Sequence, residues 1–193
     1  MDIRQLFLGE HVNEIVTVKG WVRTFRANRF IALNDGSCLG NMQCVVDFEQ
    51  MSEEILAKIN TGAALEVQGT LVESQGKGQK FEVQVVNLKV LGTSNPDEYP
   101  IQPKKHSLEF LREKAHLRIR TNTFAAVMRV RAALSFAVHQ YFTQNGFYQA
   151  HTPIITGSDA EGAGEMFRVT TKDPNQPSNE PDFFGKETNL TVS

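Results

Sequence analysis

The sequence predicts an α+β protein made of a small β-barrel, a basic connecting segment and a long helix that opens an antiparallel unit. Over the first 90 residues, apolar and polar residues alternate in short runs, which is typical of half-buried strands. Over residues 122–144, apolar residues instead follow helical spacing. Residues 92–103 lie between these patterns and are rich in turn-forming residues, so they form the expected linker.

Five strands and one short helix are expected in the N-terminal part. In the first strand, Val16, Val18 and Val22 share one face and alternate with polar neighbours. A helix of residues 52–59 begins at Ser52, whose side chain can cap it. The expected strands cover residues 14–24, 30–34, 42–47, 65–71 and 81–90. Three strands, a helix and two strands form the element order of an OB-fold barrel, although small barrels of other types share this order.

The composition excludes several classes of protein. Cys38 and Cys44 do not have zinc-ligand spacing, and we interpret them as buried thiols in a reducing compartment. The five histidines lack Cys or acidic partners at ligand spacing, so no metal site is expected. The N-terminus lacks the apolar core of a signal peptide, and no run reaches membrane-spanning length. We therefore expect a cytoplasmic protein.

Charge is distributed unevenly along the chain. Residues 101–131 hold eight Lys and Arg against two acids, whereas residues 1–100 hold nine basic and thirteen acidic residues. A basic segment between more acidic regions could bind phosphates. The alternative is a solvated helix face, and the charge pattern alone favours neither interpretation strongly.

The helix predicted at residues 122–144 has an unusually wide apolar surface. Gly146 can end this helix, because glycine tolerates the left-handed conformation that helix ends adopt. A strand is then expected at residues 147–155, where Pro153 offers no backbone N–H and therefore indicates an edge or a boundary between chains. The helix is either a core helix of one subunit or a core helix that also meets a partner. Its apolar stripe consists of Val127, Val130, Leu134, Val138 and Tyr141.

This helix, Gly146, the aromatic strand and Pro153 together resemble motif 1 of the class II aminoacyl-tRNA synthetases. The resemblance implies a homodimer whose interface contains Pro153. It also divides the chain into an OB-fold anticodon-binding domain at 1–100, a hinge at 101–120 and an incomplete class II catalytic domain at 121–193. The catalytic domain of that class is built on an antiparallel sheet.

Arginines and aromatic residues lie side by side on the expected barrel strands. Arg26 could contact phosphate or base, Phe30 offers a stacking face, and Gln43 offers an amide that can bind a base edge. This set resembles the anticodon-binding barrel of the aspartyl-, asparaginyl- and lysyl-tRNA synthetases. The resemblance implies that Phe30 stacks on the central anticodon uridine, which Arg26 and Gln43 hold. The alternative is that Phe30 belongs to the core and the arginines are solvated.

The glycine-rich run at residues 158–167 does not fit a dinucleotide loop, because no βαβ unit surrounds it. It instead resembles the amino-acid-binding loop of asparaginyl-tRNA synthetases. Segments 105–112 and 183–193 likewise resemble the corresponding segments of those enzymes. The resemblance implies that Glu161 and Ser193 bind asparagine, with the Glu161 carboxylate on the substrate ammonium group. The alternative for Glu161 is an exposed loop acid.

The implied reaction is the activation of asparagine with ATP and Mg²⁺ and its transfer to tRNA(Asn). No match exists to the arginine-containing motifs 2 and 3 of the family, so the chain is expected to contain no catalytic residues, to bind neither ATP nor Mg²⁺, and to be inactive alone. Two alternatives stay open. One is a stand-alone OB-fold nucleic-acid-binding module with an unrelated helical tail, and the other is a fragment of an aspartyl-type synthetase.

Overall fold

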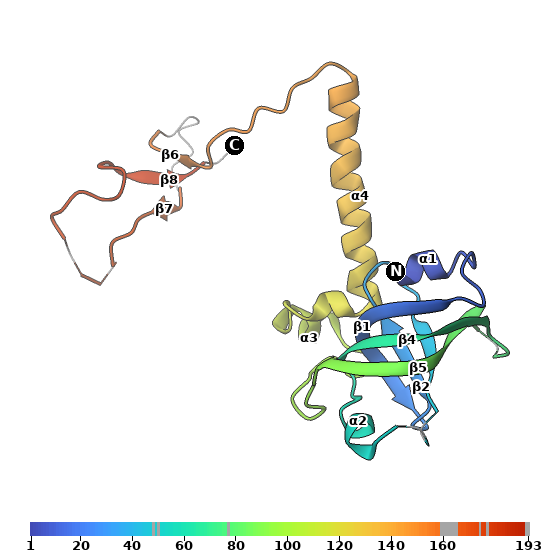
Figure 1. Cartoon of the computed structure of the whole chain (residues 1–193). Coiled ribbons are helices and arrows are strands. Elements are labelled where there is room, and N and C mark those ends of the chain that lie inside the picture. The colour runs from blue at the N-terminus through green and yellow to red at the C-terminus, as the bar shows by residue number, and fades with distance from the viewer. Residues whose placement is uncertain are drawn as a thin grey trace. The chain divides into compact units, whose positions relative to one another are not determined.

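The computed structural model describes residues 1–47, 49, 51–76, 78–158, 166–173, 175–176 and 178–191. The chain divides into two compact units, residues 1–134 and 135–193, and each unit is described by itself. The first contains the barrel, the hinge and the first half of the long helix α4, and the second contains the rest of α4 and a small sheet (Figure 1).

A closed five-stranded barrel forms the N-terminal part, and its strands are β1 (Ile15–Arg26), β2 (Phe30–Asn34), β3 (Met42–Val45), β4 (Ala64–Glu73) and β5 (Phe81–Gly92). The order around the barrel is β1-β2-β3-β5-β4 (Figure 1). The β3–β5 pair is parallel, and the other pairs are antiparallel. Helix α2 (Glu53–Ala57) lies between β3 and β4 in sequence, and the Ser52 side chain caps it. The predicted OB-fold barrel is therefore confirmed.

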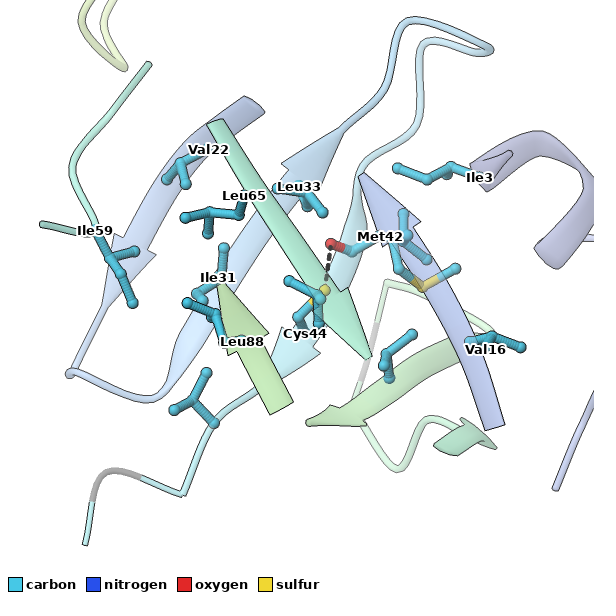
Figure 2. Packing of buried hydrophobic residues seen from close by; sticks show 14 of the residues in the cluster. Ile3, Val16, Val22, Ile31, Leu33, Met42, Cys44, Ile59, Leu65 and Leu88 are labelled. Atoms are coloured by element: carbon cyan, nitrogen blue, oxygen red, sulfur yellow. Dashed lines mark hydrogen bonds between the residues drawn. The ribbon is translucent and has the colours of Figure 1, made fainter. Parts of the chain in front are cut away.

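Alternating side chains of all five strands fill the interior of the barrel. Figure 2 shows this cluster, in which Val22, Ile31, Leu33 and Leu65 come from three different strands. Burying each of these side chains contributes about 1.5–3 kcal/mol. Cys44 is fully buried in the same cluster, and burial raises the pKa of its thiol to about 12. The other predicted buried thiol, Cys38, is only partly buried against the core, because it lies in the loop after β2.

A short N-terminal helix, α1 (Ile3–Leu6), was not predicted from the sequence. Asp2 caps it by accepting a hydrogen bond from the backbone N–H of Gln5 at 2.8 Å. Ile3 is fully buried in the barrel core (Figure 2), and Leu6 is fully buried in the same cluster. The helix is therefore held by tertiary packing, since four residues are too few to form a helix alone.

The hinge contains helix α3 (Leu108–Glu113) and a 3-10 helix, η2 (Arg118–Arg120). Ser107 caps α3 by accepting a hydrogen bond from the N–H of Phe110 at 3.2 Å. Helix α4 (Asn122–Gln144) has the predicted bounds. Thr121 Oγ1 accepts a hydrogen bond from the N–H of Phe124 at 3.3 Å and so caps its start, while Gly146 follows its end with φ +83°.

The second unit contains a three-stranded antiparallel sheet of β6 (Ile155–Thr156), β7 (Arg168–Val169) and β8 (Thr188–Leu190), in the order β6-β8-β7. The strand predicted at residues 147–155 is wrong over most of its length, because Ile155, at the start of β6, is the one residue of this segment that belongs to a paired strand. A strand needs a neighbour to bond its backbone groups, and β8 has only three residues. Within the described residues, no helix is long and apolar enough to span a membrane.

Candidate nucleic-acid interface

The outer face of β1, β2 and β3 brings Arg26, Phe30 and Gln43 together. Arg26 lies opposite Phe30 in the β1–β2 ladder, and Gln43 lies opposite Ala32 in the β2–β3 ladder. Ile31 and Leu33 point to the interior and are fully buried. Because side chains alternate along a strand, Phe30 and Ala32 point outward, and the side chains paired with them share that outer face.

Phe30 is half-buried, so it is neither a core residue nor a fully solvated one. Arg26 is exposed, and Gln43 is half-buried. A partly exposed ring beside an exposed guanidinium and an amide can stack on a base, contact a phosphate and form hydrogen bonds to a base edge. The surface formed by Arg26, Phe30 and Gln43 is called the outer face below.

A tight turn between β1 and β2 adds a second cation to the outer face. Ala27 and Asn28 both have positive φ, and the N–H of Arg29 donates to the carbonyl of Arg26 at 3.0 Å. These values are typical of a type I′ hairpin turn. The turn places the Arg29 guanidinium 5.8 Å from the centroid of the Phe30 ring, within cation–π range. Arg29 was missed in the sequence, where only its position next to Phe30 could have indicated it.

Glu82 of β5 is a second residue that the sequence analysis missed. The Gln43 Nε2 donates to Glu82 Oε2 at 3.0 Å, across the parallel β3–β5 pair. The same carboxylate accepts hydrogen bonds from Ser74 Oγ at 2.8 Å and from Gln84 Nε2 at 2.9 Å. This contact uses one of the two Gln43 Nε2 hydrogens and orients the amide, whose Oε1 can accept a hydrogen bond. Nothing in the sequence indicated that residues 43 and 82 pair.

The predicted roles of Pro153 in dimerisation and of Glu161 and Ser193 in asparagine binding all stay predictions. Pro153 is exposed in an irregular segment before β6. The apolar stripe of α4 is also exposed, from 49% for Val127 to 64% for Tyr141. Glu161 and Ser193 lie outside the described residues, so their predicted roles stay predictions.

Two families match this chain in different regions. An OB-fold nucleic acid binding domain of the tRNA anticodon type matches residues 16–91, and the class II tRNA synthetases of the D, K and N type match residues 107–193. The second match leaves no support for a barrel with an unrelated helical tail.

Curated proteins and solved structures agree with these matches. An asparagine–tRNA ligase of Cytophaga hutchinsonii is 53% identical over 95% of this chain, and one of Borreliella afzelii is 47% identical over the whole chain. The chain spans 42% and 44% of the length of these two relatives. An asparaginyl-tRNA synthetase of Pyrococcus horikoshii, solved with asparaginyl-adenylate, has a TM-score of 0.80 over the whole chain and 42% of its own, at 24% identity. That of Entamoeba histolytica has a TM-score of 0.72 over 97% of this chain and 42% of its own, at 25% identity.

Proposed function

We infer that this chain binds the anticodon loop of tRNA(Asn) on the outer face of its barrel. The chain is homologous to the asparagine–tRNA ligases over a part that holds their anticodon-type OB domain and the beginning of their class II domain. The observation that carries the proposal is the convergence of Arg26, Phe30 and Gln43 on that face. Phe30 stacks on the central uridine of the anticodon, Gln43 bonds the edge of that base, and Arg26 neutralises a neighbouring phosphate.

The geometry supports a division of labour among these residues. Stacking gives affinity without sequence preference, because every base has a π-face. A fixed amide gives preference, because it offers one pattern of donors and acceptors. The Gln43 amide, held by Glu82, offers a free acceptor, and the N3–H of uridine is a donor where cytidine has an acceptor. The outer face therefore favours uridine over cytidine at the stacked position.

For the longer protein to which the relatives correspond, we propose an ATP- and Mg²⁺-dependent asparagine–tRNA ligase that acts as a cytoplasmic homodimer. Glu161 and Ser193 bind asparagine, and Pro153 lies in the two-fold interface. The residues that grip ATP belong to the part of the relatives that this chain does not match. An aspartyl-type synthetase remains the alternative, and comparing asparagine with aspartate as substrate of the longer protein decides between them.

Binding of an anticodon stem-loop to the 193-residue chain tests the role of the barrel. A stem-loop with a central uridine should bind, and Phe30→Ala should weaken it by about 1–3 kcal/mol, which is the usual worth of one stacked base. Fluorescence anisotropy at one fixed salt concentration measures this, because phosphate contacts make affinity depend steeply on salt.

Phe183→Ala is the matched control, since Phe183 is 76% exposed and belongs to the second unit. It should leave the affinity unchanged. Equal affinity of Phe30→Ala and the unaltered chain for the stem-loop would refute the stacking role and return Phe30 to a packing residue.

A further inference from the structure

A second concave surface, distinct from the outer face, lies within the first compact unit. Residues of β1, the loop after β2, the hinge and the first half of α4 line it, and its volume is about 1130 Å³. This volume lies slightly above the usual range of about 300–1,000 Å³ for small-molecule pockets and is far larger than a single phosphate requires. This surface is called the hinge cleft below.

The hinge cleft is positively charged without compensation by acids. Among the described residues that line it, none is Asp or Glu. Five lining residues are Lys or Arg and two are His, and they are Arg23, Lys104, Lys105, Arg120, Arg129, His106 and His116. A cleft that is lined by positive charges and has low-dielectric walls attracts anions more strongly than an open surface does.

Arg23 contributes a charge inside the cleft. Its guanidinium is half-buried and donates to Asn122 Oδ1 at 3.3 Å, a neutral acceptor. Burial lowers the pKa of Arg23 from its ordinary value, and the Arg120 charge acts in the same direction, while Tyr99 partly offsets both. The guanidinium stays charged at neutral pH, so a partly desolvated cation faces the cleft without a carboxylate partner.

The remaining walls supply apolar and aromatic surface. Ile101 and Leu111 are buried in its apolar wall, and Arg120 stacks on Trp21 with its guanidinium carbon 4.4 Å from the ring centroid. Asn41 also lines the cleft, although its Oδ1 is itself buried and accepts no hydrogen bond from the described residues.

We propose that the hinge cleft binds a free nucleoside polyphosphate. Its phosphates lie against Arg23 and Arg120, and its base or ribose lies on the apolar wall. This ligand combines the two properties of the lining, positive charge and apolar surface, whereas inorganic phosphate fills a small part of the volume. RNA phosphates are the other source of this chemistry, and competition by the stem-loop distinguishes the two. The proposal is independent of anticodon binding, because the hinge cleft and the outer face share no residue named for either site.

Isothermal titration calorimetry on the 193-residue chain, without Mg²⁺ and at fixed salt, tests this with ATP, inorganic tripolyphosphate and adenosine. ATP should bind most tightly, tripolyphosphate more weakly, and adenosine weakest of all. Arg23→Gln and Arg120→Gln should each weaken ATP roughly tenfold, as expected for one charge-assisted contact. Arg23→Lys, which keeps the charge, should recover part of the loss. Arg112→Gln is the control, because Arg112 lies outside the hinge cleft and pairs with Glu109 on the surface of α3.

Asn41→Asp gives a second test that keeps both arginines and nearly the same volume. Placing a carboxylate in the hinge cleft should weaken ATP by more than tenfold through like-charge repulsion, and anticodon stem-loop binding should stay unchanged. The source of the phosphate is tested by competition, in which the stem-loop should not displace ATP.

Three results would overturn the proposal. ATP affinity that is equal in Arg23→Gln, Arg120→Gln and the unaltered chain would place the nucleotide elsewhere. Displacement of ATP by the stem-loop would assign the cations to RNA. Failure of ATP to bind a chain that still binds the stem-loop would show that the hinge cleft has no nucleotide affinity.

Discussion

Glu82 orients a hydrogen-bonding group on the outer face of the barrel, the Gln43 amide, whereas Phe30 and Arg26 have no such oriented partner there among the described residues. Its carboxylate accepts a hydrogen bond from Gln43 and is itself held by Ser74 and Gln84. A carboxylate near RNA phosphates is electrostatically unfavourable, so we expect it to act through the orientation of Gln43 and not through affinity.

Glu82→Ala should therefore change the preference for uridine more than the affinity for RNA. The ratio of affinities for stem-loops with central uridine and central cytidine should fall roughly tenfold, the worth of one well-oriented hydrogen bond. Anisotropy titrations with the two stem-loops measure this ratio. Glu66→Ala, which removes an acid of β4 that pairs with Lys19, is the control. An unchanged ratio in Glu82→Ala would show that Gln43 needs no second residue to orient it.

Asp35 connects the loop after β2 to the N-terminal helix α1. Its carboxylate accepts a hydrogen bond from the backbone N–H of Ile3 at 2.7 Å. It also accepts two hydrogen bonds from Ser37, one from the backbone N–H at 2.8 Å and one from the hydroxyl Oγ at 2.7 Å. Partial burial alone would raise the pKa of Asp35, but these hydrogen bonds outweigh burial and lower it. A lowered folded-state pKa stabilises the fold above the unfolded-state pKa of about 3.9, and this stabilisation is lost as the pH falls below that value.

Asp35→Asn should lower the stability of the barrel at pH 7 by about 1–2 kcal/mol, allowing for partial exposure of the carboxylate. The difference from the unaltered chain should shrink at pH 3, because below the unfolded-state pKa of about 3.9 the unfolded chain binds a proton that the folded Asp35 binds less readily. Urea unfolding followed by fluorescence of Trp21, the single tryptophan of the chain, measures both values. Asp97→Asn, in an exposed loop, is the control. A difference that is the same at both pH values would show that the charge of Asp35 is not the cause.

At the residue scale, the sequence could indicate the types of side chain in the candidate site but not their partners. Arg26, Phe30 and Gln43 were predicted because a cation, an aromatic ring and an amide on neighbouring strands suit RNA binding, and their role stays a prediction. Glu82 was missed because its role depends on the parallel pairing of β3 with β5, which brings together residues 39 positions apart.

At the scale of the elements, local signals placed helices better than strands. The bounds of α4 were predicted correctly, because Thr121 caps its start and Gly146 follows its end with positive φ. The strand at 147–155 was mostly wrong, because aromatic and β-branched residues favour extended backbone but only a neighbouring strand makes a ladder. Helix α1 was missed because its stability comes from two buried side chains and not from its own length.

The exposed stripe of α4 requires a surface to cover it, and we expect a second copy of the chain to do so. The stripe residues at spacings of three and four lie on one face, and all are exposed within the chain. Two-fold dimers are the commonest closed assembly, and they bury one patch of each chain against the same patch of the other.

The chain should therefore sediment as a dimer at micromolar concentration, and Val130→Glu and Val138→Glu should each shift it toward monomer. Analytical ultracentrifugation measures the distribution. Gln140→Glu adds the same charge to a different face of α4 and should leave the dimer intact. A clean monomer of the unaltered chain would contradict the role of α4, and with it the interface role of Pro153.

At the scale of the whole molecule, the order of elements predicted the barrel but not how it closes. Closure depends on the β3–β5 pair and on the long β1–β4 ladder, both of which join segments distant in sequence. The hinge cleft was not predicted at all. Four of its five Lys and Arg residues were visible as a basic segment, but their convergence with Arg23 requires β1, the hinge and α4 to fold into one unit.

The chain spans less than half of the length of its curated relatives, and its expected activity follows from what this part contains. Activation of an amino acid by ATP needs groups that hold the triphosphate in line and stabilise its developing charge, and these supply most of the rate. The sequence contains no match to the arginine motifs that do this in the resembled family. The 193-residue chain should therefore show no asparagine-dependent exchange of pyrophosphate into ATP, even if ATP binds in the hinge cleft.

In the longer protein, Glu161→Gln should raise the KM for asparagine by the loss of one charge-assisted contact, about 1.5–3 kcal/mol. Asp173→Asn, a loop acid outside the resembled motif, should leave that KM unchanged. Measurable exchange by the pure chain would contradict the need for those arginines, whereas an unchanged KM in Glu161→Gln would make Glu161 an ordinary surface acid.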